Sequence, residues 1–239
     1  MNGILAAGFF QNISDALYKA VIQEDRYLFY IDGIKVTIII SLLAILLGVA
    51  IGLLVAVLKV ASANNKKLWI LGKICNLYTT IIRATPVIVQ LLIFSNLVFT
   101  SRDSNLLLVA ALCFGINSGA YVAEIIRAGL ESVDSGQMEA GRSLGLTYIQ
   151  TMRLIIIPQA IKNILPALGN EFITLIKETS VAGVIAVTDI TKAAQYIGSV
   201  TWDILTPLFI AALIYLIMVL GLTKLLGIFE RRMAQGDRN

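Results

Sequence analysis

Three polar side chains recur on one face of an otherwise apolar stretch at residues 163–188. Glu171, Thr174 and Glu178 stand at positions i, i+3 and i+7, so a helix stacks them on one side. Two carboxylates and a hydroxyl can hold the α-ammonium group or the cationic side chain of an amino acid. A charge at mid-bilayer costs about 2.5–3.5 kcal/mol, so such residues face a cavity or a partner. The competing interpretations are gating, and a structural role in which Glu178 and Lys177 lie at the headgroup level or form a closed ion network.

A second polar group surrounds a proline in the segment Arg83-Ala84-Thr85-Pro86. Because Pro86 lacks an N–H, it frees a backbone carbonyl one turn earlier and predicts a kink or break in a helix. Broken membrane helices line transport pathways. We expect Arg83 either to receive a substrate carboxylate or to pair with an acid such as Glu171. Gln90, at i+7 from Arg83, is an accessory candidate for the path.

Between these two groups lies a polar segment with the punctuation of a helix–turn–helix. Asp134 with Gln137, and Thr147 with Gln150, have the spacing of capping boxes. Gly145 between them suits the left-handed position that ends a helix. Pro158 predicts a break or kink at Ile157. The segment is either a surface for a partner or two amphipathic turns packed on the protein itself.

Composition places these segments in a membrane protein. Of 239 residues, 58% are hydrophobic and 14% are charged, against roughly 25% charged in soluble proteins. Residues 34–58 carry only Lys35, and at ~1.5 Å per residue they extend ~37 Å, enough for a ~30 Å hydrocarbon core. The predicted fold is all-α, with five transmembrane helices at about 34–58, 68–100, 105–127, 163–188 and 204–228.

The distribution of basic residues predicts the orientation of the five spans. If the loop after the first span is cytoplasmic, eleven of the 19 Lys and Arg residues lie inside, five lie outside and three lie within spans. This satisfies the positive-inside rule. The N-terminus is then outside, and the loop at 128–162 and the tail at 229–239 are cytoplasmic. The net charge of +4 thus reflects orientation rather than nucleic-acid binding.

The first 30 residues precede the predicted five-helix domain at 31–228. They lack the basic start and small-residue cleavage site of a signal peptide. Ile13, Leu17 and Val21 recur every four residues among charged neighbours. We expect an extracytoplasmic amphipathic helix at the membrane interface, where it contacts lipids.

At the polar loop a family resemblance becomes specific. The pattern E-A-A, three residues, G, nine residues, I-x-L-P is the signature of bacterial ABC-importer permeases. Here Glu139, Ala140, Gly145, Ile155 and Pro158 match it, while Gly141 replaces the third-position Ala and Ile157 replaces the Leu. The stretches 83–86 with Gln90, 120–127 and 169–180 resemble the polar amino acid uptake branch, of the histidine, glutamine and arginine type. The resemblance extends from Ile34 to the C-terminus.

The resemblance implies a multi-pass permease of the bacterial inner membrane. In that family this loop is a coupling helix that seats in a cleft of the ATPase, which gives Glu139, Ala140, Gly141, Gly145, Ile155 and Pro158 here a coupling role. The implied partners are two ATP-hydrolysing subunits, a second permease copy or a sister permease, and an extracytoplasmic amino-acid-binding protein. No cofactor is expected in this chain; ATP and Mg²⁺ belong to the ATPase.

Missing motifs narrow the choice of function. The chain has no histidine and no phosphate-binding loop of the G-x-x-x-x-G-K-[ST] type. It is therefore not expected to hydrolyse ATP or to act as an intramembrane enzyme. The alternative to an importer permease is an ion-gradient-driven secondary transporter or channel for small polar solutes. Many secondary transporters have inverted repeats, and no repeat is visible here.

Overall fold

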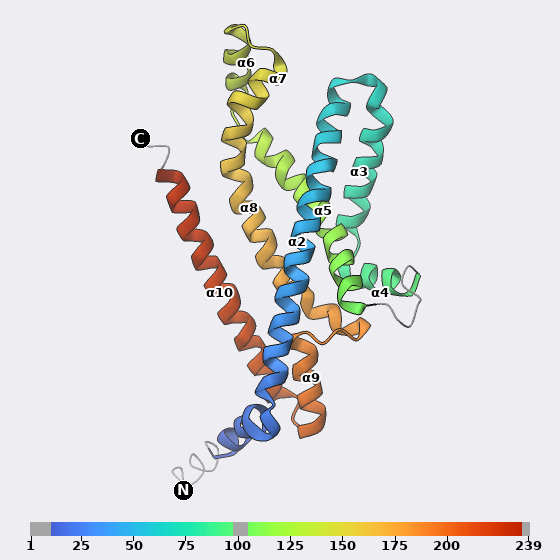
Figure 1. The fold of residues 1–239 in the computed structure, drawn as a ribbon, viewed down its shortest axis with the longest axis vertical. Helices are drawn as coiled ribbons and strands as arrows, with labels where there is room; N and C mark the ends of the chain where they lie inside the picture. The colour runs from blue at the N-terminus through green and yellow to red at the C-terminus, as the bar shows by residue number, and fades with distance from the viewer. Residues whose placement is uncertain (1–10, 98–104, 236–239) are drawn as a thin grey trace.

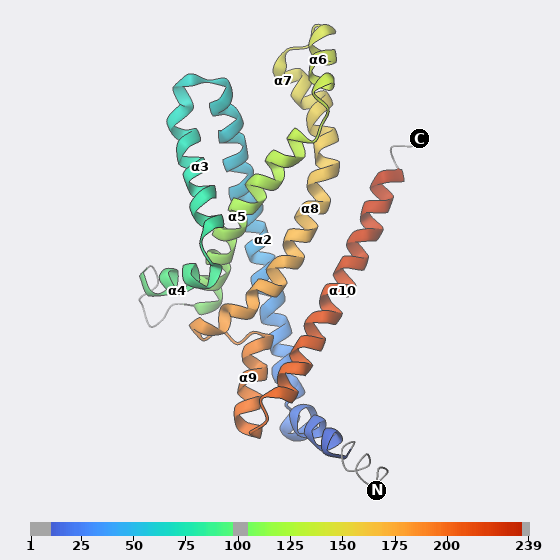
Figure 2. The same ribbon diagram turned by 180° about the vertical axis from the view of Figure 1, so that it is seen from behind.

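Long helices lying side by side make up the chain. The computed structural model describes residues 11–97 and 105–235, and Figures 1 and 2 show it from opposite sides. The predictions for residues 1–10, 98–104 and 236–239, including Arg102 and Arg238 in the charge count, lie outside the described residues. The helices after the N-terminal segment are α2 (Tyr27–Asn64), α3 (Trp69–Ala84), α4 (Val87–Leu97), α5 (Leu106–Glu131), α6 (Ser135–Ser143), α7 (Tyr148–Thr151), α8 (Ile157–Glu178), α9 (Ile190–Thr201) and α10 (Leu205–Gln235).

The N-terminal segment is helical but ends abruptly before the first long helix. Residues 11–17 continue into a π-helical turn, Tyr18–Ile22, with Ile13, Leu17 and Ile22 exposed. Glu24 and Asp25 have φ near +55°, and the backbone turns there. The buried Arg26 guanidinium then donates a 2.6 Å hydrogen bond to the Lys19 carbonyl. Of the predicted apolar face, Ile13 and Leu17 are exposed, whereas Val21 packs partly buried against the core around Ile190. An interfacial position of this segment stays a prediction.

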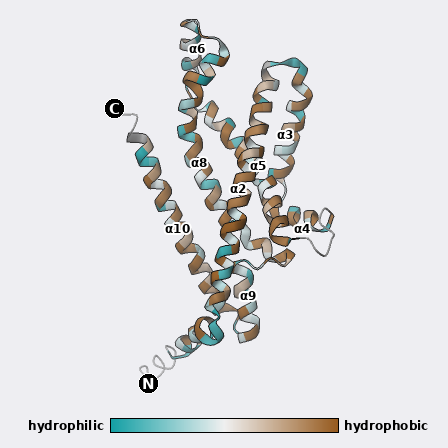
Figure 3. Cartoon of the chain, viewed as in Figure 1, coloured by the Kyte–Doolittle hydropathy of each residue, from teal (hydrophilic) through white to brown (hydrophobic). Residues whose placement is uncertain are grey.

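Three described helices are long and apolar enough to cross a membrane. They are Tyr27–Ala63, Leu106–Glu131 and Leu205–Met233, and the bent pair Lys66–Ala84 with Val87–Leu97 raises the number to four. In Figure 3 hydrophobic colours cover most of α2 and α10. The segment predicted as the fourth span is α8 followed by a 3-10 turn, Thr179–Ile185. Its polar residues make this segment less hydrophobic than the three helices named above, and it is not among the candidate spans. The count of five spans therefore stays a prediction.

Glycines allow α2 and α5 to approach closely. A Cβ at Gly48 would lie 2.8 Å from Ser118 Oγ, and one at Gly52 would lie 2.5 Å from Val122 Cγ1. From the other helix, Gly115 and Gly119 receive Leu47 and Ile51 in the same way. The pairs Gly48–Gly52 on α2 and Gly115–Gly119 on α5 therefore lie in one contact between the two helices. This contact fixes the polar residues of α5 relative to α2.

The two ends of the molecule carry different elements. Figures 1 and 2 agree that α6, α7 and the last turns of α10 lie at one end, with the α2–α3 connection. The described N-terminal segment, from residue 11, and α9 lie at the opposite end.

Substituting Gly52 with Val should separate α2 from α5. The added atoms overlap Val122, and overpacking of this kind costs about 1–3 kcal/mol, which lowers the melting temperature by roughly 2–10 °C. Thermal unfolding of the detergent-purified protein measures the shift. Gly221→Val on α10 is the control, since nothing lies within 4 Å of a Cβ there. Equal melting temperatures for the two variants would contradict the packing account.

Candidate coupling loop and translocation path

The polar loop folds into a helical hairpin, residues 135–151, as its punctuation predicts. Asp134 caps α6 by accepting a 2.6 Å hydrogen bond from the Gly136 N–H. Gly145 has φ +84°. Its N–H donates to the Arg142 carbonyl, and the Leu146 N–H donates to the Gly141 carbonyl, at 3.0 and 3.1 Å. These two bonds form a Schellman motif, so the predicted left-handed joint is confirmed.

The second helix of the hairpin starts with a complete capping box. The Thr147 hydroxyl accepts from the Gln150 N–H, and the Gln150 side chain accepts from the Thr147 N–H. The first box is only half formed, because the Gln137 side-chain oxygen accepts from Gln159 at 3.4 Å. Both helix starts in the sequence are nevertheless located correctly.

The coupling residues divide into exposed and packed ones. Glu139, Ala140, Gly145 and Pro158 are exposed, whereas Gly141 is buried. A Cβ at Gly141 would lie 2.6 Å from Thr151 Cγ2 and 3.1 Å from Ile155 Cδ1. Gly141 and Ile155 therefore hold the two helices of the hairpin together. The third-position Gly suits this close approach.

Two exposed apolar residues on the hairpin surface are not among the residues predicted from the sequence. Leu144 is 81% exposed and Ile149 is 75% exposed. They flank the Gly145 joint, where the connection between the helices is short. An exposed apolar pair beside an acid such as Glu139 suits a protein partner rather than open water. In the sequence, both residues lie within four positions of the turn glycine Gly145, and this position could have indicated that they are exposed.

Pro158 does not end the helix that follows the hairpin. A π-helical turn, Met152–Ile156, joins α7 to α8, and the Ile157 N–H donates to the Met152 carbonyl. Pro158 then occupies the start of α8. The disruption that the proline predicts takes the form of one widened turn. The helical path therefore runs from Tyr148 to Glu178.

Pro86 breaks the second hydrophobic segment as predicted. The axes of α3 and α4 differ by 109°. The Gln90 side-chain nitrogen donates to the Ile82 carbonyl at 2.8 Å and to the Thr85 hydroxyl at 2.7 Å. Ile82 lies four residues before Pro86, so its carbonyl is the one that the missing N–H frees. Gln90 therefore braces the break, and its oxygen accepts from Asn117 on α5 at 3.0 Å.

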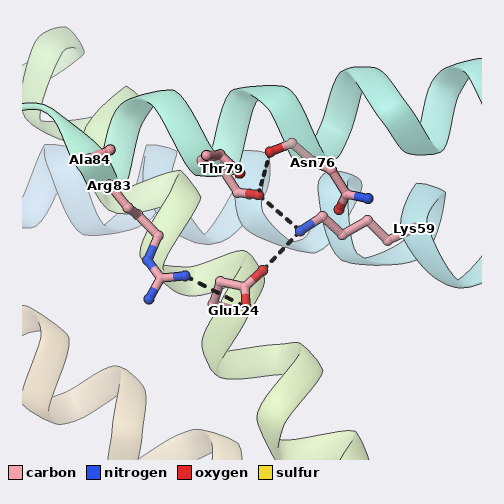
Figure 4. A pocket seen from close by; sticks show the side chains of 7 residues that line it. Lys59, Asn76, Thr79, Arg83, Ala84 and Glu124 are labelled. Atoms are coloured by element: carbon pink, nitrogen blue, oxygen red, sulfur yellow. Dashed lines mark hydrogen bonds and ion pairs between the residues drawn. The ribbon is translucent and has the colours of Figure 1, made fainter.

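Arg83 lies at a polar cavity of about 420 Å³ between α2, α3 and α5, shown in Figure 4. Its acidic partner is Glu124 at 3.6 Å, which corrects the expected pairing with Glu171. Glu124 also accepts from Lys59 at 2.8 Å and from Arg127 at 2.9 Å. Glu124 is the nearer acid because the close α2–α5 contact presents it beside Lys59. Three cations therefore surround one carboxylate.

The acidic face on α8 is half-buried in the described chain. Glu171 accepts a 2.8 Å hydrogen bond from the Ser118 hydroxyl of α5. The Thr174 hydroxyl donates to the Asn170 carbonyl of its own helix at 3.0 Å. Glu178 is partly exposed, and no ion pair joins Glu171 or Glu178 to a cation within the described residues. The closed ion network that is one of the competing interpretations therefore does not form among the described residues.

A turn between α9 and α10 marks the opposite end of the molecule. Trp202 has φ +57° and is 95% exposed. The next residue, Asp203, accepts from the Thr206 N–H at 3.1 Å. Hydrogen bonds from the side chain and backbone of Thr206 hold the pKa of Asp203 below its usual value. The turn stays charged and presents its Trp outward.

Comparisons with known proteins agree with this arrangement. Residues 48–235 match the family described as binding-protein-dependent transport system inner membrane component. A putative glutamine transport permease of Rickettsia felis is 37% identical over 87% of this chain and 94% of its own length. An arginine transport permease of Bacillus subtilis is 36% identical over 87% of the chain and 94% of its own length.

Solved structures give the same result. An amino acid ABC transporter crystallised with histidines aligns at a TM-score of 0.80 and 44% identity, covering 86% of this chain and 94% of the other. The inward-facing methionine ABC transporter aligns at a TM-score of 0.75 and 19% identity, over 89% and 99% of the two chains, which shows the fold alone. The chain belongs to the family of binding-protein-dependent transport system inner membrane components. It is therefore a permease subunit of an ABC importer.

Replacing Gln90 with Leu should weaken the bend rather than act on a transported solute. The change removes the donor that satisfies the Ile82 carbonyl, and a carbonyl left without its partner in a buried site costs about 1–3 kcal/mol. We expect a lower melting temperature for the purified complex and normal uptake per folded complex. Ser95→Ala is the control, because its hydroxyl contacts only its own helix, at the Leu92 carbonyl. Unchanged stability with lost uptake would identify Gln90 as a path residue.

Proposed function

We propose that this permease forms half of an alternating-access path for polar amino acids and is driven by separate ATPase subunits. The observation that carries the proposal is the protruding hairpin, residues 135–151. It is fixed by two caps and a Schellman joint, and it exposes Glu139 with Leu144 and Ile149. Because this surface is already ordered before binding, a partner can bind it without the entropy cost of ordering a loop.

The proposed assembly supplies what the single chain lacks. Two ATPase subunits carry ATP and Mg²⁺ and seat on the hairpins, at the cytoplasmic end. A second copy or a sister permease completes the path, and lipids surround the rest. An extracytoplasmic binding protein delivers the amino acid to the end that carries α9 and Trp202. The N-terminus lies on that outer side and the C-terminus in the cytoplasm.

The proposed substrate path includes the acidic face of α8. Glu171 and Glu178 are acids that no cation of the described chain neutralises, so a substrate ammonium group is a fitting partner for them. Thr174 and, secondarily, Arg83 complete the set, and Gln90 contributes by bracing the bend beside Arg83. An acidic path favours a cationic or zwitterionic amino acid. The relatives named for glutamine and arginine transport support this substrate class.

The proposed cycle follows from these positions. Closure of the two ATPases on ATP moves the hairpins and turns the helices to an outward-open state. The amino acid enters from the binding protein and contacts the acidic face. Hydrolysis separates the ATPases, and the path opens inward. The permease contributes binding, orientation and movement, and the ATPase contributes the reaction.

Reversing the charge of Glu139 tests the docking surface. In Glu139→Lys we expect loss of the co-expressed partner ATPase, because an exposed acid at the hairpin becomes a base. Co-purification at matched membrane expression is the measurement. Glu230→Lys, an equal charge change on α10 at the same end of the molecule, should retain the ATPase. If wild-type protein retains none, the coupling proposal fails and an ion-driven transporter becomes the better hypothesis.

Neutralising Glu171 tests the path. Glu171→Gln keeps the hydrogen bond from Ser118 but removes the charge that an ammonium group needs. We expect uptake per assembled complex to fall roughly tenfold or more, in line with a lost charge-assisted hydrogen bond, while ATPase binding stays normal. Lys177→Gln, on an exposed position of the same helix, is the matched control. Normal uptake in Glu171→Gln, or defective assembly alone, would remove Glu171 from the path.

A further inference from the structure

The connection between α2 and α3 is a tightly packed corner at the hairpin end of the molecule, as Figures 1 and 2 show. The Asn65 side chain accepts a 3.0 Å hydrogen bond from the Lys67 N–H and caps the 3-10 turn Lys66–Leu68. Gly72 then lies so close to α2 that a Cβ there would be 2.3 Å from Ser62 Oγ. The start of α3 is therefore fixed against the end of α2.

Positive charge is concentrated on the outer side of this connection. Lys66, Lys67 and Lys73 are exposed, and none of them forms an ion pair with an acid of the described residues. Lys59 on α2 differs, because Glu124 neutralises it at 2.8 Å. Three positive charges within the segment 66–73, with no acid among them, favour an anionic partner.

Trp69 indicates the depth at which these charges lie in the membrane. It is 53% exposed, and the Lys73 ammonium group lies 4.5 Å from the centre of its ring, a cation–π contact. Trp is enriched at the level of the lipid headgroups, between water and hydrocarbon. Lys73 lies one helical turn further along α3 and reaches back toward this level, as long basic side chains near a membrane interface do. The three lysines and Trp69, together the lysine corner, therefore lie at the height of lipid phosphates.

Next to the lysine corner, α3 carries an apolar stripe on the side opposite to its buried residues. The stripe recurs at i, i+4, i+7 and i+11, and each member is at least 50% exposed: Ile70, Ile74, Leu77 and Ile81. At ~1.5 Å per residue the stripe is ~17 Å long, close to the ~15 Å of one leaflet in a ~30 Å hydrocarbon core. A membrane-crossing helix of another subunit would need about twice this length. The stripe therefore fits the acyl chain of a lipid in one leaflet.

We propose that the lysine corner binds the phosphate headgroup of an anionic phospholipid in the adjacent leaflet, and that an acyl chain of this lipid lies along the stripe. The ligand class is a diacyl lipid with a net negative headgroup, such as phosphatidylglycerol. The lysines supply the charge, and Trp69 supplies the contact at the boundary between headgroup and chain. The site lies outside the proposed transport path and does not depend on the proposed importer function.

The two tryptophans of the chain make this site measurable. Because Trp202 lies at the opposite end, Trp202→Phe leaves Trp69 as the only Trp of the chain. The purified full-length chain with this change is reconstituted in phosphatidylcholine bilayers that contain a minor share of phosphatidylglycerol. Brominated acyl chains quench a neighbouring Trp, so brominating one lipid class at a time gives the relative affinity of each class at Trp69. We expect a preference for phosphatidylglycerol of roughly 100-fold, since each lysine contributes about fivefold.

Replacing Lys66, Lys67 and Lys73 together with Gln should abolish this preference. Replacing the same three residues with Arg should retain it, because Arg keeps the charge. Lys224→Gln is the matched control, since this lysine is exposed on α10, and it should leave the preference unchanged. An excess of inorganic phosphate should displace no phosphatidylglycerol, because phosphate lacks the acyl chain that the stripe binds.

Equal quenching by the two brominated lipids in the Trp202→Phe chain would overturn the site, and so would a preference that survives the three Gln substitutions. Displacement by inorganic phosphate would overturn the assignment to a lipid. Loss of the partner ATPase in the Gln variant, with no lipid preference in the unsubstituted corner, would assign the corner to a protein partner instead. Failure of the importer proposal is distinguishable, because lipid preference at Trp69 is measured without ATPase or transport.

Discussion

A backbone polar group that a helix break frees within the membrane region must find its partner in protein or in an aqueous path. A broken helix is the clearest case, since Pro86 frees the Ile82 carbonyl where no lipid can satisfy it. The Gln90 amide meets that carbonyl, and Asn117 holds the amide in turn. Without this chain of hydrogen bonds the 109° bend has no support. The placement of α4 and of the Arg83 cavity depends on it.

The same constraint separates the two acidic centres. Glu124 is surrounded by cations and is a closed, structural acid. Glu171 has only the Ser118 hydroxyl, and Glu178 has no cationic partner among the described residues. One centre holds α2, α3 and α5 together, and the other carries two acids that no ion pair of the described residues neutralises. The two centres therefore differ in whether a further cation could be bound.

Local features of the fold were predictable from the sequence, and contacts between distant segments were not. The Thr147 capping box, the Gly145 joint and the Pro86 break each depend on a few neighbouring residues with fixed backbone preferences. The pairing of Arg83 with Glu124 depends on how α3 lies against α5, and no local pattern of residues specifies that packing. The spacing of Gln90 from Arg83 can be seen in the sequence, and it predicts a position in the path. The hydrogen bond from Gln90 to the Ile82 carbonyl forms only because the chain bends, so the sequence does not show it. Likewise, Pro158 predicts a break in the helix, but the π-helical turn at Met152–Ile156 keeps the helix continuous up to the proline.

That widened turn has a mechanical consequence. Because the helical path from Tyr148 to Glu178 is continuous, at ~1.5 Å per residue it forms a rod about 45 Å long. Near its middle, Ile164 packs directly on Gly129 of α5, where the helices are so close that a Cβ on Gly129 would overlap the Ile164 side chain. Pro166 lies inside α8 two residues further on, and a proline inside a helix is a point where the helix bends. The contact and the proline together therefore mark a pivot between the hairpin end and the Glu178 end of this rod.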